Sequence, residues 1–372
     1  MRIGVPKESA DGERRVALVP DVVKSLKRNE RVDVVVESGA GAASGHPDSQ
    51  YADAGADVVE GAVAWGADVV CHVGIPSTED IAKLGSGQLL ISHLAPWTSA
   101  ETNKALAGAG VTAFAMEAIP RTTRAQAMDA LSSQAAAAGY AATLIAARES
   151  GRFFGMMTTA AGTVPPAKVL VLGAGVAGLQ AVATAKRLGA VVTGFDIRRA
   201  AWEQIASLGG RPLELDFIPD AEGEGGYARP LTEEENAQVR EALAQNAAKQ
   251  DIIVTTAAIP GRPAPLLVTA EAVRNMAPGS VIVDLAAETG GNCELTQAGE
   301  TVVENGVKVL GPRNLASEMP APASQLYAKN LENLLGLLVT EEGEVEVDFS
   351  DDILAAACIT QGGEIRNERA AQ

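Results

Sequence analysis

Short apolar runs alternate with segments of helical periodicity over most of the chain. Before residue 120, apolar runs predict strands over residues 3–5, 32–36, 69–73, 89–91 and 111–114. Between these runs, apolar positions spaced three and four residues apart predict helices over residues 21–27, 78–84 and 100–106. This alternation is typical of a parallel sheet that is covered by helices.

A second series of the same kind follows a long segment rich in alanine and leucine. That segment, residues 125–150, contains few helix-breaking residues and predicts one long helix that bridges two domains. Strands are then expected over residues 167–172, 191–196, 252–255, 281–284 and 307–310, and helices over 175–188 and 200–207. Thr232 and Glu235 have the spacing of a capping box at the start of another helix. A last apolar helix is expected over residues 324–339, packed on the first domain.

Composition and charge restrict the function. The chain has 47 acidic and 30 basic residues and a net charge of −17, so binding to nucleic acid or to an anionic lipid surface is not expected. Its apolar segments are too short or too interrupted to cross a bilayer, which predicts a cytoplasmic protein with no direct membrane insertion. The 3 cysteines and 3 histidines lack the spacing of a metal site, so no metal is expected.

A glycine-rich turn is the strongest local signal. Gly173, Gly175 and Gly178 form G-x-G-x-x-G between a predicted strand and a predicted helix. In this setting the first glycine permits the tight turn, the second lets the backbone approach a pyrophosphate, and the third lets the helix pack closely. Asp196 ends the next strand, where a carboxylate accepts a hydrogen bond from a ribose 2′-hydroxyl, which favours NAD over NADP.

The turn and the elements around it predict both the fold and a cofactor site. We expect an α/β protein with two Rossmann-like domains, each a parallel sheet flanked by helices, joined by long helices. The first domain is expected over residues 1–130, completed by about 320–372, and the NAD-binding domain over 131–319. The candidate cofactor-binding residues are Gly173, Ala174, Gly175, Val176, Ala177, Gly178, Asp196, Ile197, Arg198, Tyr227, Thr256 and Ala257.

A polar cluster precedes the long helix. It contains Arg121, Gln126, Asp129 and Ser132, of which the last three would share one face of a helix. Gln126 and Ser132 are hydrogen-bonding groups rather than strong acids or bases. From the residues alone, this segment is either a functional site or the capped, solvated start of a helix. His93, after a predicted strand, is open to a catalytic or a structural interpretation.

Several stretches together resemble the NAD(H)-binding component of proton-translocating nicotinamide nucleotide transhydrogenases. The likeness covers nearly the whole chain and is similar to the separate soluble subunit of some bacteria. The stretches are residues 2–8, 12–20, 120–134, 156–190, 225–229 and 278–294.

The resemblance implies a function and a set of site residues. Such a component binds NAD(H) and exchanges a hydride directly with NADP(H) on a partner subunit, and membrane subunits couple this exchange to proton translocation. Transfer between two nicotinamides requires oriented rings rather than an acid or base at the reacting carbons. By similarity, Arg121, Gln126, Asp129 and Ser132 set the nicotinamide end of NAD(H), Gln126 also faces the NADP(H) side, and Tyr227 lies on a mobile lid.

The same resemblance implies partners. We expect a homodimer that docks on the NADP(H)-binding and membrane-spanning subunits, at the inner face of the cytoplasmic membrane.

Two alternatives remain at this point. Alanine dehydrogenases are similar, and Arg15 and His93 match their pattern, but Gly74 stands where that family has a substrate-binding lysine and Glu288 where it has a catalytic aspartate. The other alternative is a non-catalytic NAD-binding regulator. The polar cluster from Arg121 to Ser132 argues against it, because a sensor does not need contacts for a second nicotinamide.

Overall fold

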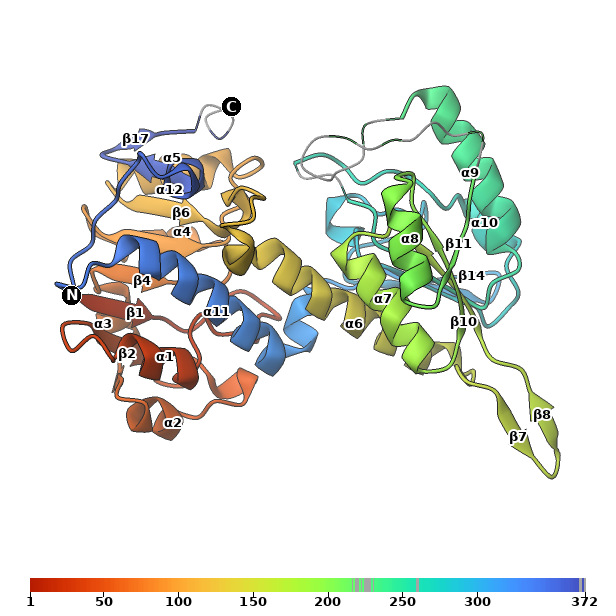
Figure 1. The fold of residues 1–372 in the computed structure, drawn as a ribbon, viewed down its shortest axis with the longest axis horizontal. Helices are drawn as coiled ribbons and strands as arrows, with labels where there is room; N and C mark the ends of the chain where they lie inside the picture. The colour runs from red at the N-terminus through yellow and green to blue at the C-terminus, as the bar shows by residue number, and fades with distance from the viewer. Residues whose placement is uncertain are drawn as a thin grey trace. The chain divides into compact units, whose positions relative to one another are not determined.

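The computed structural model divides into two compact units, each with its own sheet (Figure 1). It describes residues 1–215, 217, 221, 223, 229, 231–258, 261–367 and 370. Unit 1 comprises Met1–Gln134 and Ser317–Gln372, and unit 2 comprises Ala135–Ala316. Helix α6 (Ala130–Ser150) begins in unit 1 and continues into unit 2.

Unit 1 contains a sheet in the order β17-β16-β6-β5-β4-β1-β2-β3. Its strands are β1 (Arg2–Val5), β2 (Asp33–Glu37), β3 (Asp57–Val59), β4 (Val69–Cys71), β5 (Leu89–Ser92), β6 (Thr112–Ala115), β16 (Cys358–Gln361) and β17 (Glu364–Ile365). Its helices, apart from the start of α6, are α1 (Pro20–Leu26), α2 (Asp48–Asp53), α3 (Gly61–Trp65), α4 (Thr78–Ile81), α5 (Ala100–Gly108), α11 (Pro320–Leu338) and α12 (Asp352–Ala357). Strands β1 to β6 pair in parallel, whereas β16 joins β6 in antiparallel fashion.

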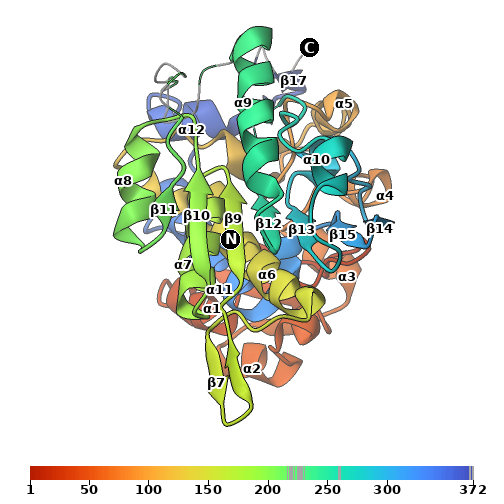
Figure 2. The same ribbon diagram turned by 90° about the vertical axis from the view of Figure 1, so that its right-hand side faces the viewer.

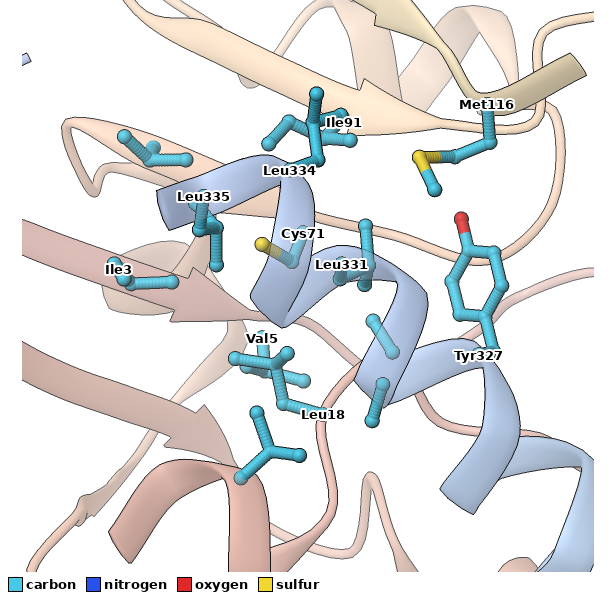
Figure 3. Close-up of a cluster of buried hydrophobic side chains, with 14 of the residues drawn as sticks. Ile3, Val5, Leu18, Cys71, Ile91, Met116, Tyr327, Leu331, Leu334 and Leu335 are labelled. Carbon is cyan, nitrogen blue, oxygen red and sulfur yellow. The ribbon is translucent and has the colours of Figure 1, made fainter. Parts of the chain in front are cut away.

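The C-terminal helix α11 closes the core of unit 1 (Figure 3). Tyr327, Leu331 and Leu334 lie on one face of α11 and are fully buried. They pack in one cluster with Ile3 of β1 and Cys71 of β4. Each buried side chain of this size contributes about 2 kcal/mol to folding. The i, i+4, i+7 spacing therefore makes residues far apart in the sequence parts of one core.

Unit 2 contains a sheet in the order β11-β10-β9-β12-β13-β15-β14 (Figure 2). Its strands are β9 (Lys168–Leu172), β10 (Val191–Phe195), β11 (Arg211–Pro212), β12 (Ile252–Thr255), β13 (Val281–Asp284), β14 (Thr301–Glu304) and β15 (Val307–Leu310). Its helices are α7 (Val176–Arg187), α8 (Ala200–Ser207), α9 (Glu233–Ala247) and α10 (Ala270–Arg274). The pairs are parallel except for the antiparallel β14–β15 pair. Strands β7 (Met157–Thr159) and β8 (Gly162–Val164) form a separate hairpin.

The predicted α/β class is confirmed, with two corrections. Both main sheets are mixed rather than wholly parallel, because the short strands β14 and β16 pair in antiparallel fashion at or near a sheet edge. The long helix begins at Ala130 rather than at residue 125, because the Asp129 carboxylate accepts hydrogen bonds from Ser132 at its first turn.

Candidate functional site

The glycine turn lies at the carboxyl end of β9 in unit 2. Gly173 has φ +92°, a left-handed backbone that side chains disfavour. A Cβ at this position would lie 2.8 Å from Thr256 Oγ1 and 2.9 Å from the Ala257 nitrogen. The tight turn therefore depends on glycine twice, through its backbone conformation and through the closeness of the loop after β12.

The other two glycines have opposite environments. A Cβ on Gly178 would lie 1.8 Å from the Gly173 carbonyl oxygen, so this glycine lets the first turn of α7 pack against the chain before it. At Gly175, by contrast, no described atom lies within 4 Å of a Cβ position. Gly175 precedes the first residue of α7, where unpaired N–H groups and the helix dipole favour an anion. Val176 beside it is 43% exposed.

Asp196 connects the turn to the next segment of the chain. Its Oδ2 accepts a hydrogen bond from the Ala174 N–H at 2.8 Å. Oδ1 accepts from the backbone N–H and Nε of Arg198, both at 2.9 Å, and Oδ2 also accepts from Nη2 at 2.8 Å. The carboxylate is 7% exposed. A ribose hydroxyl that binds Asp196 must therefore share it with, or displace, the Arg198 guanidinium. Ile197 lies between the two.

Thr256 and Ala257 follow β12 and lie against the glycine turn. Thr256 Oγ1 donates to the Gly173 carbonyl at 3.0 Å, and the Ala257 N–H donates to Asn292 Oδ1 at 3.0 Å. The structure thus places Gly173, Asp196, Thr256 and the start of α7 together at the carboxyl edge of one sheet. Tyr227 of the predicted lid lies outside the described residues.

The polar cluster of unit 1 is not one helical face. Asp129 has the non-helical dihedrals φ −71° and ψ 85° and stands between the 3-10 turn Gln126–Met128 and α6. Its carboxylate accepts from the Ser132 N–H at 2.9 Å and from Ser132 Oγ at 2.6 Å. Asp129 and Ser132 therefore meet as an N-terminal cap of α6. Arg121 and Gln126 are exposed.

Two tertiary contacts hold this cluster. Asn330 of α11 donates to the Ala127 carbonyl at 2.8 Å. Arg124 pairs with Asp351 at 2.6 Å, and its guanidinium lowers the pKa of that carboxyl to about 2. Gln126 is thus exposed on a segment whose backbone is anchored from both α11 and the start of α12.

The residues that match alanine dehydrogenases also lie in unit 1. Arg15 pairs with Glu13 at 2.6 Å and donates to Gln134 Oε1 at 2.8 Å. The His93 ring stacks on Tyr327 with 5.3 Å between centroids. Gly74 presents no side chain, and a Cβ there would face Glu8 Oε2 at 3.6 Å. The position of the substrate-binding lysine is therefore empty of any cation of its own.

Sequence reasoning missed a buried polar pair at the end of β13. Asp284 and Asn292 are both fully buried and bond to each other and to the loop after β12. The acid at the end of a strand and the following Gly-Gly-Asn were visible in the sequence. Their role was not, because it depends on contacts with the segment 255–257.

Two absences concern the described residues alone. No group of histidine, cysteine and acidic residues among them could hold a metal ion. None of the helices that they form is long and apolar enough to cross a membrane.

Comparisons with known proteins agree with this geometry. Residues 4–138 match the model "Alanine dehydrogenase/PNT, N-terminal domain" and residues 142–368 match "Alanine dehydrogenase/PNT, C-terminal domain". The chain is 47% identical to NAD(P) transhydrogenase subunit alpha of Haemophilus influenzae, over 98% of this chain and 71% of that protein. It is 46% identical to the first of the separate alpha-subunit chains of the Rhodospirillum rubrum NAD(P) transhydrogenase, over 98% and 97% of the two chains. The crystal structure of a transhydrogenase from Sinorhizobium meliloti superposes with a TM-score of 0.90 at 46% identity, covering 98% of this chain and 100% of that one.

Proposed function

Because the chain belongs to the alanine dehydrogenase/PNT family, we propose that it is the NAD(H)-binding alpha component of an NAD(P) transhydrogenase. It exchanges a hydride between NAD(H) bound here and NADP(H) bound on a partner subunit. Membrane-spanning subunits couple the exchange to proton translocation and hold the component at the inner face of the cytoplasmic membrane. The observation that carries the binding half of the proposal is the open backbone at Gly175, at the N-terminus of α7.

The residues of unit 2 fit a dinucleotide. The free N–H groups at the start of α7 suit the pyrophosphate, because no side chain stands between Gly175 and a ligand. Asp196 suits a ribose hydroxyl and repels a 2′-phosphate. The bound dinucleotide supplies the nicotinamide carbon that gives or accepts the hydride. The chain itself orients that ring, which is the main requirement of a direct transfer.

The polar cluster is assigned to the nicotinamide end. Arg121 and Gln126 are exposed on an anchored segment, and Asp129 and Ser132 fix the start of α6 beside them. An amide group such as that of Gln126 can bind a carboxamide without taking part in proton transfer. Gln126 is therefore the residue we place closest to the second nucleotide.

A Gln126→Asn variant tests this assignment. The shorter side chain keeps the amide but withdraws it by one methylene, so the two rings lose a positioning contact. We expect transfer to slow by roughly tenfold to a hundredfold, with NADH affinity within about twofold of the parent protein. Single-turnover transfer and NADH titration give the two numbers. A transfer rate equal to that of the parent protein removes Gln126 from the transfer site.

The alternative reaction of the family is disfavoured by Gly74. An amino-acid dehydrogenase needs a cation at this position to hold a keto-acid carboxylate, and glycine supplies none. We therefore expect no oxidation of NADH when pyruvate and ammonia are added. NADH consumption under those conditions would favour the dehydrogenase.

The hairpin β7–β8 supports a homodimer. An isolated two-stranded hairpin is marginally stable in water, and this one belongs to neither main sheet. Apolar side chains on and beside it are exposed, with Met156 at 66%, Met157 at 42% and Val164 at 47%. A second copy of the chain would cover this surface.

A charged hairpin tests the dimer. Replacing Met156→Glu together with Met157→Glu is expected to give a monomer in sedimentation equilibrium. The matched control is Val303→Glu on β14, which is 62% exposed and lies outside the hairpin. The control should sediment as a dimer. A dimeric double variant would show that another surface joins the copies.

Reconstitution tests the function as a whole. The protein is mixed with an NADP(H)-binding transhydrogenase component, NADPH and an NAD analogue whose reduced form absorbs at a distinct wavelength. We expect reduction only when both proteins are present. If NADH binds tightly but no reduction follows with a competent partner component, the chain is a sensor or a dehydrogenase rather than a transhydrogenase component.

A further inference from the structure

A buried polar relay lies behind the glycine turn in unit 2. It begins at Asp284, the last residue of β13, which is fully buried. Asp284 Oδ2 accepts from the Asn292 N–H at 2.7 Å, and Oδ1 accepts from Thr255 Oγ1 at 2.8 Å. The carboxylate thus ties the end of β12 to the chain segment that carries Asn292.

The Asn292 side chain continues the relay toward the turn. Its Oδ1 accepts from the Ala257 N–H at 3.0 Å, and its Nδ2 donates to the carbonyls of Ala257 and Pro265, each at 2.8 Å. One amide group therefore binds both polar groups of Ala257 and joins two loops. Asn292 is itself fully buried, so water does not replace these bonds.

Backbone geometry shows that this position of Asn292 is specified. Gly290 and Gly291 precede it with φ +102° and +80°. A Cβ on Gly291 would lie 3.0 Å from Asp284 Oδ2 and 2.9 Å from Thr296 Cβ. Two left-handed residues thus bring the Asn292 backbone onto the Asp284 carboxylate, which side chains at those positions would resist.

The relay ends on the surface that the nucleotide needs. Thr256, which adjoins Ala257, donates to the Gly173 carbonyl at 3.0 Å. The space beside Gly173 is filled by Thr256 Oγ1 and the Ala257 nitrogen. Any shift of the Thr256–Ala257 segment therefore moves the wall of the glycine turn.

We propose that Asn292 is a positioning residue for NAD(H): it fixes the Thr256–Ala257 segment against Gly173 so that the binding edge is formed before the dinucleotide arrives. Asp284 holds Asn292 in place. The proposal rests on the proposed NAD(H) site and adds to it a residue that need not touch the ligand. Loss of the Asn292 amide frees the polar groups of Ala257, and binding must then include the ordering of this segment.

The test compares two buried asparagines. Asn292→Ala removes the relay. The matched control is Asn103→Ala in unit 1, because Asn103 is fully buried and its Nδ2 donates to the carbonyls of Pro96 at 2.8 Å and Ala370 at 2.9 Å. Each full-length variant is titrated with NADH by fluorescence, and its melting temperature is measured without ligand.

We expect both variants to melt earlier and only Asn292→Ala to bind NADH about tenfold more weakly, a change of about 1.4 kcal/mol. Asn292→Ser, whose side chain is too short to bridge Ala257 and Pro265, should weaken binding similarly and serves where the alanine variant does not fold. An NADH affinity within about twofold of the parent, in a folded Asn292 variant, overturns the proposal. A parent protein that does not bind NADH contradicts the proposed function instead, before any variant is measured.

Discussion

The Gly178→Ala and Gly175→Ala substitutions are expected to abolish NADH binding in different ways. At Gly178 the new methyl would lie 1.8 Å from the Gly173 carbonyl, so α7 must move away from the turn. Such overpacking costs about 3 kcal/mol of folding free energy, and the displaced helix no longer presents its N-terminus. At Gly175 the methyl meets no described atom within 4 Å, so the fold is retained while the approach of a pyrophosphate is blocked.

Thermal unfolding and NADH titration separate the two effects. Gly178→Ala should lower both the melting temperature and the affinity, the latter by roughly a hundredfold. Gly175→Ala should lower the affinity alone. Gly336→Ala, at an exposed position in α11 with no described atom near its Cβ, is the control and should stabilise slightly. Unchanged NADH affinity in Gly175→Ala would place the dinucleotide somewhere other than the glycine turn.

The Asp284→Ala substitution is expected to have the largest effect on stability. Its carboxylate accepts from the hydroxyls of Thr255 and Thr296 and from the backbone N–H groups of Ala286, Asn292 and Cys293. Alanine leaves these donors buried without an acceptor. Each buried, unsatisfied donor costs about 1–3 kcal/mol, so the sum approaches the whole stability of a typical domain.

Circular dichroism during heating measures this effect. Unit 2 of Asp284→Ala should be unfolded at room temperature, or should melt far below the parent protein. Asp348→Ala is the control, since Asp348 is exposed and bonds only locally to Ser350 at 2.8 Å among the contacts described. A melting temperature of Asp284→Ala within about 2 °C of the parent would show that the donors find other partners.

The regular strands and the glycine turn were predictable because their signals are local. The strands at 252–255, 281–284 and 307–310 are continuous apolar runs, and the structure has them at Ile252–Thr255, Val281–Asp284 and Val307–Leu310. The glycine pattern was readable because each glycine answers a constraint set by its immediate neighbours in space. The capping box of Thr232 and Glu235 is likewise confirmed at α9.

The features that were missed depend on distant partners. Strand β16 is short and becomes a strand only by pairing with β6. The polar cluster was predicted as one helical face, but the Asp129 cap starts α6 later, and Asn330 of α11 fixes what precedes it. Asp284 and Asn292 are ordinary polar residues in the sequence, and only the loop after β12 gives them a common task.

Direct transfer of the hydride is the central claim, and an isotope label tests it most directly. NADPH carrying two deuterium atoms at the nicotinamide C4 is mixed with NAD⁺, this protein and the NADP(H)-binding component in ordinary water. The NADH formed is separated and its mass determined. The account predicts NADH that carries one deuterium at C4, because the hydride passes from ring to ring without exchange with solvent. NADH without deuterium, or no NADH at all with a competent partner component, would contradict it.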